Sequence, residues 1–154
     1  MNLKFKVFAH IAKPVAEVFE AVVDPAILSR YFTTGGAKGR LEAGSTVTWD
    51  FHDFPGAFPV EVVEVEADRK IVLRWGDNGS RSAAGGTAHA TTVTMTFEAT
   101  QDGRTLVSIS EEGWRATDEG LQASYGNCEG WGQMLCALKM WLEHRINLRE
   151  GMYK

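Results

Sequence analysis

Cysteine and proline are scarce in this chain, which excludes a small disulfide-stapled fold. The 154 residues include two cysteines and four prolines. Cys128 and Cys136 fall in what we expect to be one helix, about 12 Å apart along its axis, which is too far for a disulfide. We therefore predict reduced, packed thiols. A chain of this length buries enough surface to fold without disulfides or metal.

No charge of one sign dominates the sequence, and no apolar run is long. Sixteen Lys and Arg stand against twenty Asp and Glu, for a formal net charge of -4. No basic field favours nucleic acid or an anionic membrane as a partner. No stretch reaches the ~18 apolar residues of a membrane span, and the N-terminus alternates apolar and polar residues instead of showing a continuous apolar run. We expect a cytoplasmic protein.

Motifs for nucleophiles, phosphates and metals are also missing. The glycine-rich stretch GGAKGR, residues 35–40, lacks the phosphate-loop pattern, and no G-x-S-x-G elbow occurs. Neither cysteine has a histidine near it on a common helix face, as a zinc site would require. We expect no cofactor and no metal, and we favour a non-enzymatic role while leaving catalysis open.

The first 35 residues predict one strand followed by two short helices. Residues 3–11 alternate apolar and polar side chains, which is typical of a half-buried strand. Pro14 suits the first turn of a helix, and the apolar residues after it recur at helical spacing. Asp24 and Pro25 form a second helix start, because Asp caps helices well and Pro fits their first turn.

Residues 37–112 read as strands and turns. Alternating segments at 45–51, 58–68, 70–75, 91–100 and 105–112 indicate an antiparallel meander, and Asp102-Gly103 marks a hairpin turn between the last two. Residues 76–89 are small and polar, with His89 at their end, so we expect a mobile loop there.

The last third predicts one long helix. Asp118 and Glu119 suit its start and Arg145 and Arg149 its end, since these charges complement the helix dipole. Apolar residues between them form a wide stripe over roughly 25 to 30 residues. An antiparallel sheet and one long amphipathic helix predict a single α+β domain over residues 1–154, in which a curved sheet wraps around the C-terminal helix.

At this point the sequence resembles a known family. The order of elements is similar to the START/Bet v 1-like (SRPBCC) superfamily, and within it to the group of the C-terminal domain of the activator of Hsp90 ATPase. The residues that carry the resemblance are Pro14 with Val18 and Phe19, Asp24-Pro25, the stretch VEVVEVEADRKIVLRW, and Gly130-Trp131 followed by Leu135 and Leu138. The resemblance implies a helix-grip fold with a cavity between helix and sheet that takes apolar molecules in relatives.

Three functions follow as hypotheses. The first is binding of a small apolar or aromatic ligand in that cavity. The alternative is regulation of an Hsp90-type chaperone, which would make a chaperone the partner. A second alternative is a cyclase-type or hydrolase-type enzyme that uses a pocket carboxylate. Fold alone does not choose among them, because folds of this kind serve many functions.

The predicted cavity lining combines inward strand residues with the apolar stripe of the helix. Aromatic side chains suit a pocket for rings or acyl chains, and they suit a solid core equally well. The candidate ligand-binding residues are Trp49, Phe51, Trp75, Met95, Phe97, Ile109, Glu111, Trp131, Leu135 and Leu138.

Three details of this region stay open. Glu111 continues the inward face of its strand, so its carboxylate either enters the interior, where burial would raise its pKa, or ends the strand in solvent. Gly130 and Gly132 weaken the helix beside Trp131, either for close approach or a bend at a pocket mouth, or because the helix start is frayed or tightly packed. Trp114 and Tyr125, between the last strand and the helix, are a pocket gate, packing at the helix cap or a dimer contact.

Overall fold

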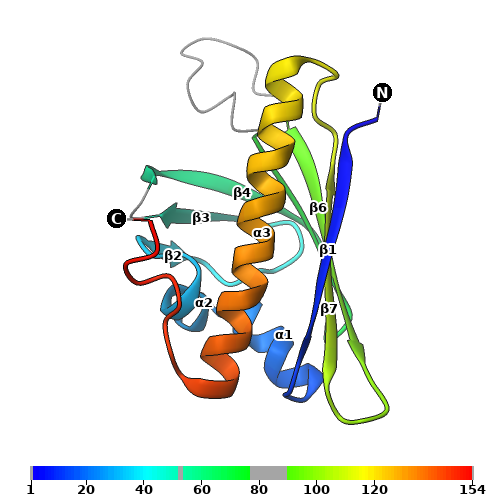
Figure 1. Cartoon of the computed structure of the whole chain (residues 1–154), viewed down its shortest axis with the longest axis vertical. Coiled ribbons are helices and arrows are strands. Elements are labelled where there is room, and N and C mark those ends of the chain that lie inside the picture. The colour runs from blue at the N-terminus through cyan, green and yellow to red at the C-terminus, as the bar shows by residue number, and fades with distance from the viewer. Residues whose placement is uncertain (1, 52–53, 77–89, 154) are drawn as a thin grey trace.

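The chain folds as one antiparallel sheet with three helices on its concave side (Figure 1). The structure is a computed structural model that describes residues 2–51, 54–76 and 90–153. The elements are β1 (Lys4–Ile11), α1 (Val15–Val23), α2 (Pro25–Tyr31), β2 (Gly36–Lys38), β3 (Thr46–Phe51), β4 (Phe54–Glu66), β5 (Lys70–Gly76), β6 (Ala90–Ala99), β7 (Thr105–Glu112) and α3 (Asp118–His144).

The sheet order is β1-β7-β6-β5-β4-β3-β2, so the first strand pairs with the last. All neighbouring strands are antiparallel. Helix α3 runs along the face that the strands curve around, and α1 and α2 close one end of the interior (Figure 1). This is the predicted helix-grip α+β fold. The short edge strand β2 is the one element that the alternation of residues did not predict.

Local signals set the helix boundaries. The Asp24 side chain accepts a hydrogen bond from the Ala26 amide at 2.8 Å and caps α2, as predicted. Thr117 caps α3 in the same way by accepting from the Gly120 amide at 3.0 Å. Helix α3 is 27 residues long, which agrees with the predicted 25 to 30. It ends at His144, and the next residue, Arg145, adopts the left-handed conformation common at helix C-termini.

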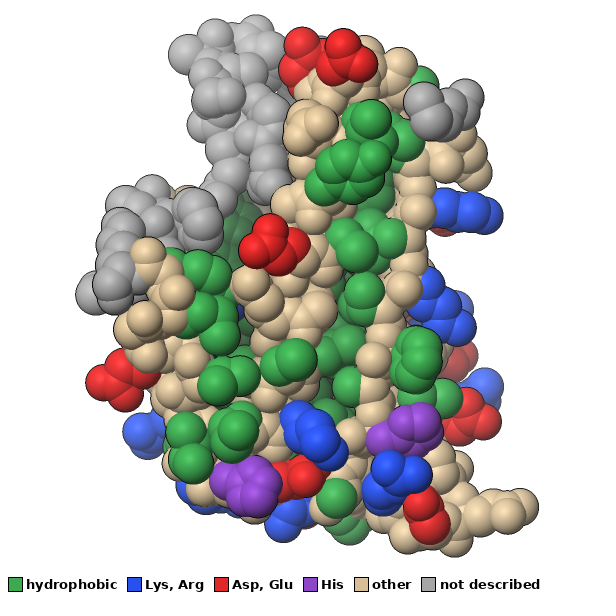
Figure 2. Space-filling view, in the orientation of Figure 1, with side chains coloured by type: hydrophobic (Ala, Val, Ile, Leu, Met, Phe, Trp, Pro, Cys, Tyr) green, Lys and Arg blue, Asp and Glu red, His purple; other side chains and the backbone are tan. Residues whose placement is uncertain are grey.

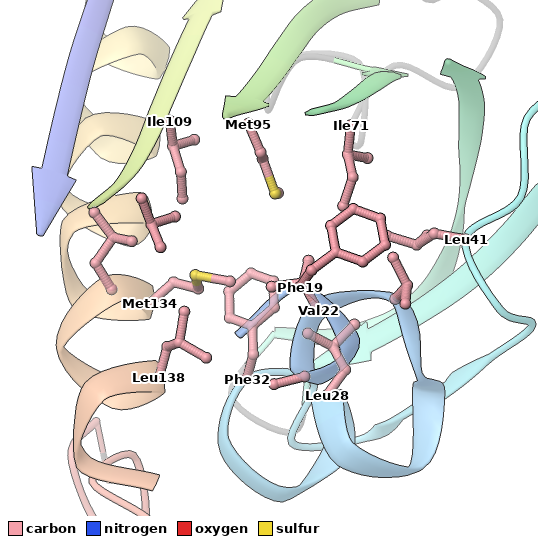
Figure 3. Close-up of a cluster of buried hydrophobic side chains, with 14 of the residues drawn as sticks. Phe19, Val22, Leu28, Phe32, Leu41, Ile71, Met95, Ile109, Met134 and Leu138 are labelled. Carbon is pink, nitrogen blue, oxygen red and sulfur yellow. The ribbon is translucent and has the colours of Figure 1, made fainter. Parts of the chain in front are cut away.

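The lower half of the interior is a packed hydrophobic core. In Figure 3, Phe19 and Leu28 from the short helices, Met95 and Ile109 from the sheet, and Leu138 from α3 point toward one another. All five are buried. The inward strand faces match the predicted alternation on β6, which buries every second residue from Thr91 to Phe97, and on β7, which does so from Thr105 to Glu111 and also buries Ser108.

The glycines of α3 need a different explanation from the ones that the sequence suggested. Gly130 and Gly132 lie well inside the helix, so they do not mark its start. A Cβ added at either position meets no atom within 4 Å, so close approach and tight packing are both wrong as reasons for them. They leave open space on the helix surface on either side of Trp131.

Other predictions meet the structure only in part. Cys128 and Cys136 are free thiols, but Cys136 is exposed rather than packed. Arg149 was predicted near the helix end; it lies five residues beyond the last residue of α3 and is buried. The predicted mobile loop with His89 falls almost entirely on residues 77–89, outside the described residues.

None of the helices in the described part of the chain combines the length and apolar content of a membrane span.

Candidate ligand-binding site

The centre of the upper interior is a buried carboxylate surrounded by donors. Glu111, near the end of β7, is 1% exposed, so it enters the interior and does not end in solvent. Trp75 of β5 and Trp131 of α3 each donate an indole N–H, both at 2.9 Å, to Oε2 and Oε1. The Thr91 hydroxyl donates to Oε2 at 2.6 Å. The Asn127 amide donates to Oε1 at 3.2 Å and to Oε2 at 3.0 Å.

This Glu111 network decides what the carboxylate can do. Burial raises the pKa of Glu111 above its ordinary value of 4.5, and the hydrogen bonds from its four partners oppose that rise. A carboxylate has roughly four lone-pair positions, so these donors fill its accepting capacity. Glu111 therefore ties three strands, β5, β6 and its own strand β7, to helix α3. For acid–base chemistry on a ligand, one of its protein donors would first have to move away.

Six aromatic rings gather beside the network. We call them the ring cluster: Phe32, Trp49, Phe51, Phe58, Trp75 and Trp131. The ring centroids of Trp75 and Trp131 are 5.4 Å apart, and the Trp49 ring meets Trp75 edge-on at 5.8 Å. Phe32 lies 5.5 Å from both Trp49 and Trp131. Distances of this size are those of favourable aromatic pairs.

One indole of the ring cluster lacks a hydrogen bond. Trp75 and Trp131 donate to Glu111, but the Nε1 of Trp49 is buried and finds no acceptor among the described residues. Trp49 itself is 1% exposed. A buried donor without a partner costs about 1–3 kcal/mol, and buried polar groups in native proteins are nearly always paired. This N–H is therefore available to an acceptor that is not part of the described chain.

The ring cluster reaches the surface at two of its members. Phe58 and Trp75 are partly exposed, whereas the other four rings are buried. Phe58 stands directly opposite Trp49 in the pairing of β3 with β4. Figure 2 shows a recess between helix α3 and the strands β3 and β4, where hydrophobic side chains lie set back from the surface.

A positive charge lies against the same rings. The guanidinium of Arg149 is 5.4 Å from the ring centroids of both Phe32 and Phe51 and 5.0 Å from that of Tyr153. These are cation–π distances. Arg149 therefore brings positive potential to the end of the ring cluster formed by Phe32 and Phe51.

The ten residues predicted for the cavity separate into two groups. Trp49, Phe51, Trp75, Glu111 and Trp131 belong to the ring cluster and the Glu111 network. The other five, Met95, Phe97, Ile109, Leu135 and Leu138, are buried in the hydrophobic core. Ligand contact stays a prediction for all ten.

Sequence reasoning missed four partners of these residues. Thr91 continues the inward face of Val93 on β6, and Asn127 is four residues before Trp131 on the same helix face, so periodicity carried a signal for both. Phe32 and Phe58 reach the ring cluster through the path of α2 and the register of β4. No local pattern indicates either of those.

Trp114 has a packing role. Its ring stacks on Phe5 of β1 with centroids 5.5 Å apart, and it is buried outside the ring cluster. Its indole Nε1 is also buried and finds no acceptor among the described residues. Tyr125, on α3, is exposed.

A separate groove lies at the strands β1, β7 and β6. Its volume is about 460 Å³, and most of its lining comes from side chains that alternate away from the core: Lys4, Lys6, Thr92, Thr94, Ser110 and Glu112, with Phe5 and Glu111 at its end. This groove is not the cavity between helix and sheet that the resemblance implies. Hydroxyl and charged side chains are the ordinary composition of a solvated sheet face.

Comparison with known proteins identifies the family. The sequence profile of the Activator of Hsp90 ATPase homolog 1-like protein family matches residues 12–143. The chain belongs to this family. A comparison with curated proteins finds no match.

Solved structures share the fold along nearly the whole chain. The protein SSP2350 from Staphylococcus saprophyticus superposes with a TM-score of 0.73 at 28% identity, covering 97% of this chain and 96% of that one. The Aha1 dimer from Colwellia psychrerythraea gives a TM-score of 0.70 at 20% identity, and the match covers 92% of this chain and 96% of the Aha1 chain. DynU16, a protein from the dynemicin biosynthetic locus, superposes with a TM-score of 0.72 at 22% identity. The match covers 96% of this chain and 49% of the DynU16 chain.

Proposed function

We propose that this protein binds a small apolar or aromatic molecule at the ring cluster, between helix α3 and the sheet. The observation that carries the proposal is the distribution of side chains in the interior. Six rings contact one another within a core whose other members are mostly aliphatic, and two of these rings, Phe58 and Trp75, are partly exposed. Aromatic surfaces of this kind hold flat or apolar ligands by contact area.

Binding at this place requires a ring to move. Trp49 and Trp131 are buried, and Trp75 is held by Glu111. Phe58 is partly exposed, and its ring stacks on Phe51 at 5.8 Å and is tilted against Trp75 at 5.6 Å. We expect the ligand to take the place of the Phe58 ring.

The test is a titration of isotope-labelled protein with apolar compounds, read from the indole N–H signals. The panel contains fatty acids, sterols and aromatic ketones with their matched hydrocarbons. We expect saturable shifts at Trp49, Trp75 and Trp131 and none at Trp141, which lies near the far end of α3. Absence of saturable shifts with every class would refute ligand binding at the ring cluster.

A second candidate function is regulation of an Hsp90-type chaperone. The family match is the observation that favours it, because the family is named for activation of the Hsp90 ATPase. The test is the ATPase rate of a purified Hsp90 chaperone with increasing amounts of this protein. Stimulation that saturates would support the role, and an unchanged rate would exclude activation.

A further inference from the structure

We infer that the ligand is an aromatic molecule with an oxygen acceptor, and that the indole N–H of Trp49 binds this acceptor. The inference rests on the proposed function, because it assigns the class of molecule that the ring cluster takes. It goes further by naming one polar group of the protein that would discriminate between ligands.

The first step is the assignment of the three indole donors in the ring cluster. Two of them end on Glu111, which holds Trp75 and Trp131 with their N–H groups turned toward the carboxylate. Glu111 is in turn saturated with donors, so it has no acceptor position left for a ligand. The Trp49 N–H is the indole donor of the cluster that an acceptor can still satisfy.

The second step is the sign of the local field. The Arg149 guanidinium lies over Phe32 and Phe51, and Phe32 is in edge contact with Trp49 at 5.5 Å. A ligand ring that packs on Phe51 would therefore lie close to this guanidinium, whose charge favours an electron-rich ligand group, such as a carbonyl or phenolate oxygen.

The third step is access. Phe58 faces Trp49 across the strand pair, and it is the partly exposed ring on that side. A ligand ring that replaces Phe58 would lie next to the Trp49 indole and retain the aromatic contacts to Phe51 and Trp75. The ligand would therefore be flat, with its oxygen directed toward β3.

The experiment compares ligands that differ only in the acceptor. The pairs are acetophenone with ethylbenzene and 1-acetonaphthone with 1-ethylnaphthalene, in which a carbonyl replaces a methylene. Affinities come from titrations of the indole N–H signals. We expect at least one ketone to bind about tenfold more tightly than its hydrocarbon, as one hydrogen bond to a buried donor implies. The Trp49 N–H signal should move downfield with the ketone only.

Two variants separate the hydrogen bond from ring packing. Trp49→Phe keeps an aromatic ring but removes the N–H, so it should abolish the preference for the ketone. Trp114→Phe is the matched control, because it also removes a buried N–H without an acceptor, but one outside the ring cluster. It should leave the preference unchanged. If Trp49→Phe fails to fold, the Trp49 signal of the wild-type protein with each pair decides the question.

The two proposals fail in different ways. Equal affinity for ketone and hydrocarbon, with no downfield shift at Trp49, would overturn the acceptor inference and leave ligand binding in place. A tenfold preference that persists in Trp49→Phe would assign the acceptor to another donor and also overturn it. Binding of neither member of either pair, together with no shifts from the wider panel, would overturn the proposed function and this inference with it.

Discussion

The indole N–H of Trp131 lies 2.9 Å from Oε1 of Glu111, and this hydrogen bond joins the middle of helix α3 to the end of strand β7. Trp75 makes the equivalent bond from β5 to the other oxygen. A single carboxylate thus fixes the orientation of two tryptophans from distant parts of the chain. The ring cluster is built around that constraint.

Removing the Glu111 carboxylate should destabilise the protein. Glu111→Ala leaves the N–H groups of Trp75 and Trp131 and the Asn127 amide without their acceptor in a buried place. We expect a loss of about 2–4 kcal/mol in the free energy of unfolding, measured by urea denaturation. The control is Glu112→Ala, since Glu112 is the exposed neighbour and should change stability by less than about 0.5 kcal/mol. Equal urea midpoints for the two variants would contradict a buried network.

The stability contributed by Glu111 should fall as pH rises. Burial raises the pKa of Glu111 above 4.5, so the folded protein holds this proton more tightly than the unfolded chain. Unfolding then releases a proton between pH 4.5 and the raised pKa, and higher pH favours the unfolded state. The contribution of the site is complete below pH 4.5 and is lost as pH passes the folded pKa.

The measurement is the difference in free energy of unfolding between the wild-type protein and Glu111→Gln, taken at each pH. The glutamine does not titrate, and the four partners of Glu111 carry no group that titrates in this range. We expect the free energy of unfolding of the wild-type protein, relative to that of Glu111→Gln, to decrease from about pH 4.5 upward and then to become constant. A difference that is flat across the range, or that moves in the opposite direction, would show that burial does not raise the pKa.

Alanine at Gly130 or Gly132 should stabilise the protein. A new Cβ meets no atom at either position, and alanine favours a helix interior over glycine by about 1 kcal/mol. The contrast is Gly120→Ala, where the Cβ would lie 1.9 Å from the backbone oxygen of Arg115 and should destabilise. Thermal unfolding distinguishes the three variants. A lower melting temperature for Gly130→Ala and Gly132→Ala would mean that the helix needs these glycines for another reason.

Removing the Phe58 ring should strengthen ligand binding. Phe58→Ala opens the place that the ligand ring would take, so the aromatic probe no longer has to displace a side chain. We expect severalfold tighter binding with only a moderate loss of stability, because Phe58 is partly exposed. Phe19→Ala is the comparison, since it empties a buried site and should cost about 3–5 kcal/mol without improving affinity. Weaker binding in Phe58→Ala would place this ring among the ligand contacts.

Local patterns in the sequence predicted which residues face inward. Strand periodicity is a property of consecutive residues, so it placed Trp49 and Trp75 on the inner face, whereas it left open whether Glu111 enters the interior or ends its strand in solvent. The helix caps at Asp24 and Thr117 act over two or three residues, and the first of these was predicted from its side chain and the proline after it.

Only the tertiary structure decided what these residues meet. The register between β3 and β4 brings Phe58 opposite Trp49, and the position of α3 brings Asn127 and Trp131 to Glu111. Such contacts join residues far apart in the chain, and they depend on how all the layers pack together. The sequence by itself determined the faces of the strands and the long helix. The donors around Glu111 and the unpaired indole of Trp49 followed from packing, because a hydrogen bond depends on distances that no local pattern encodes.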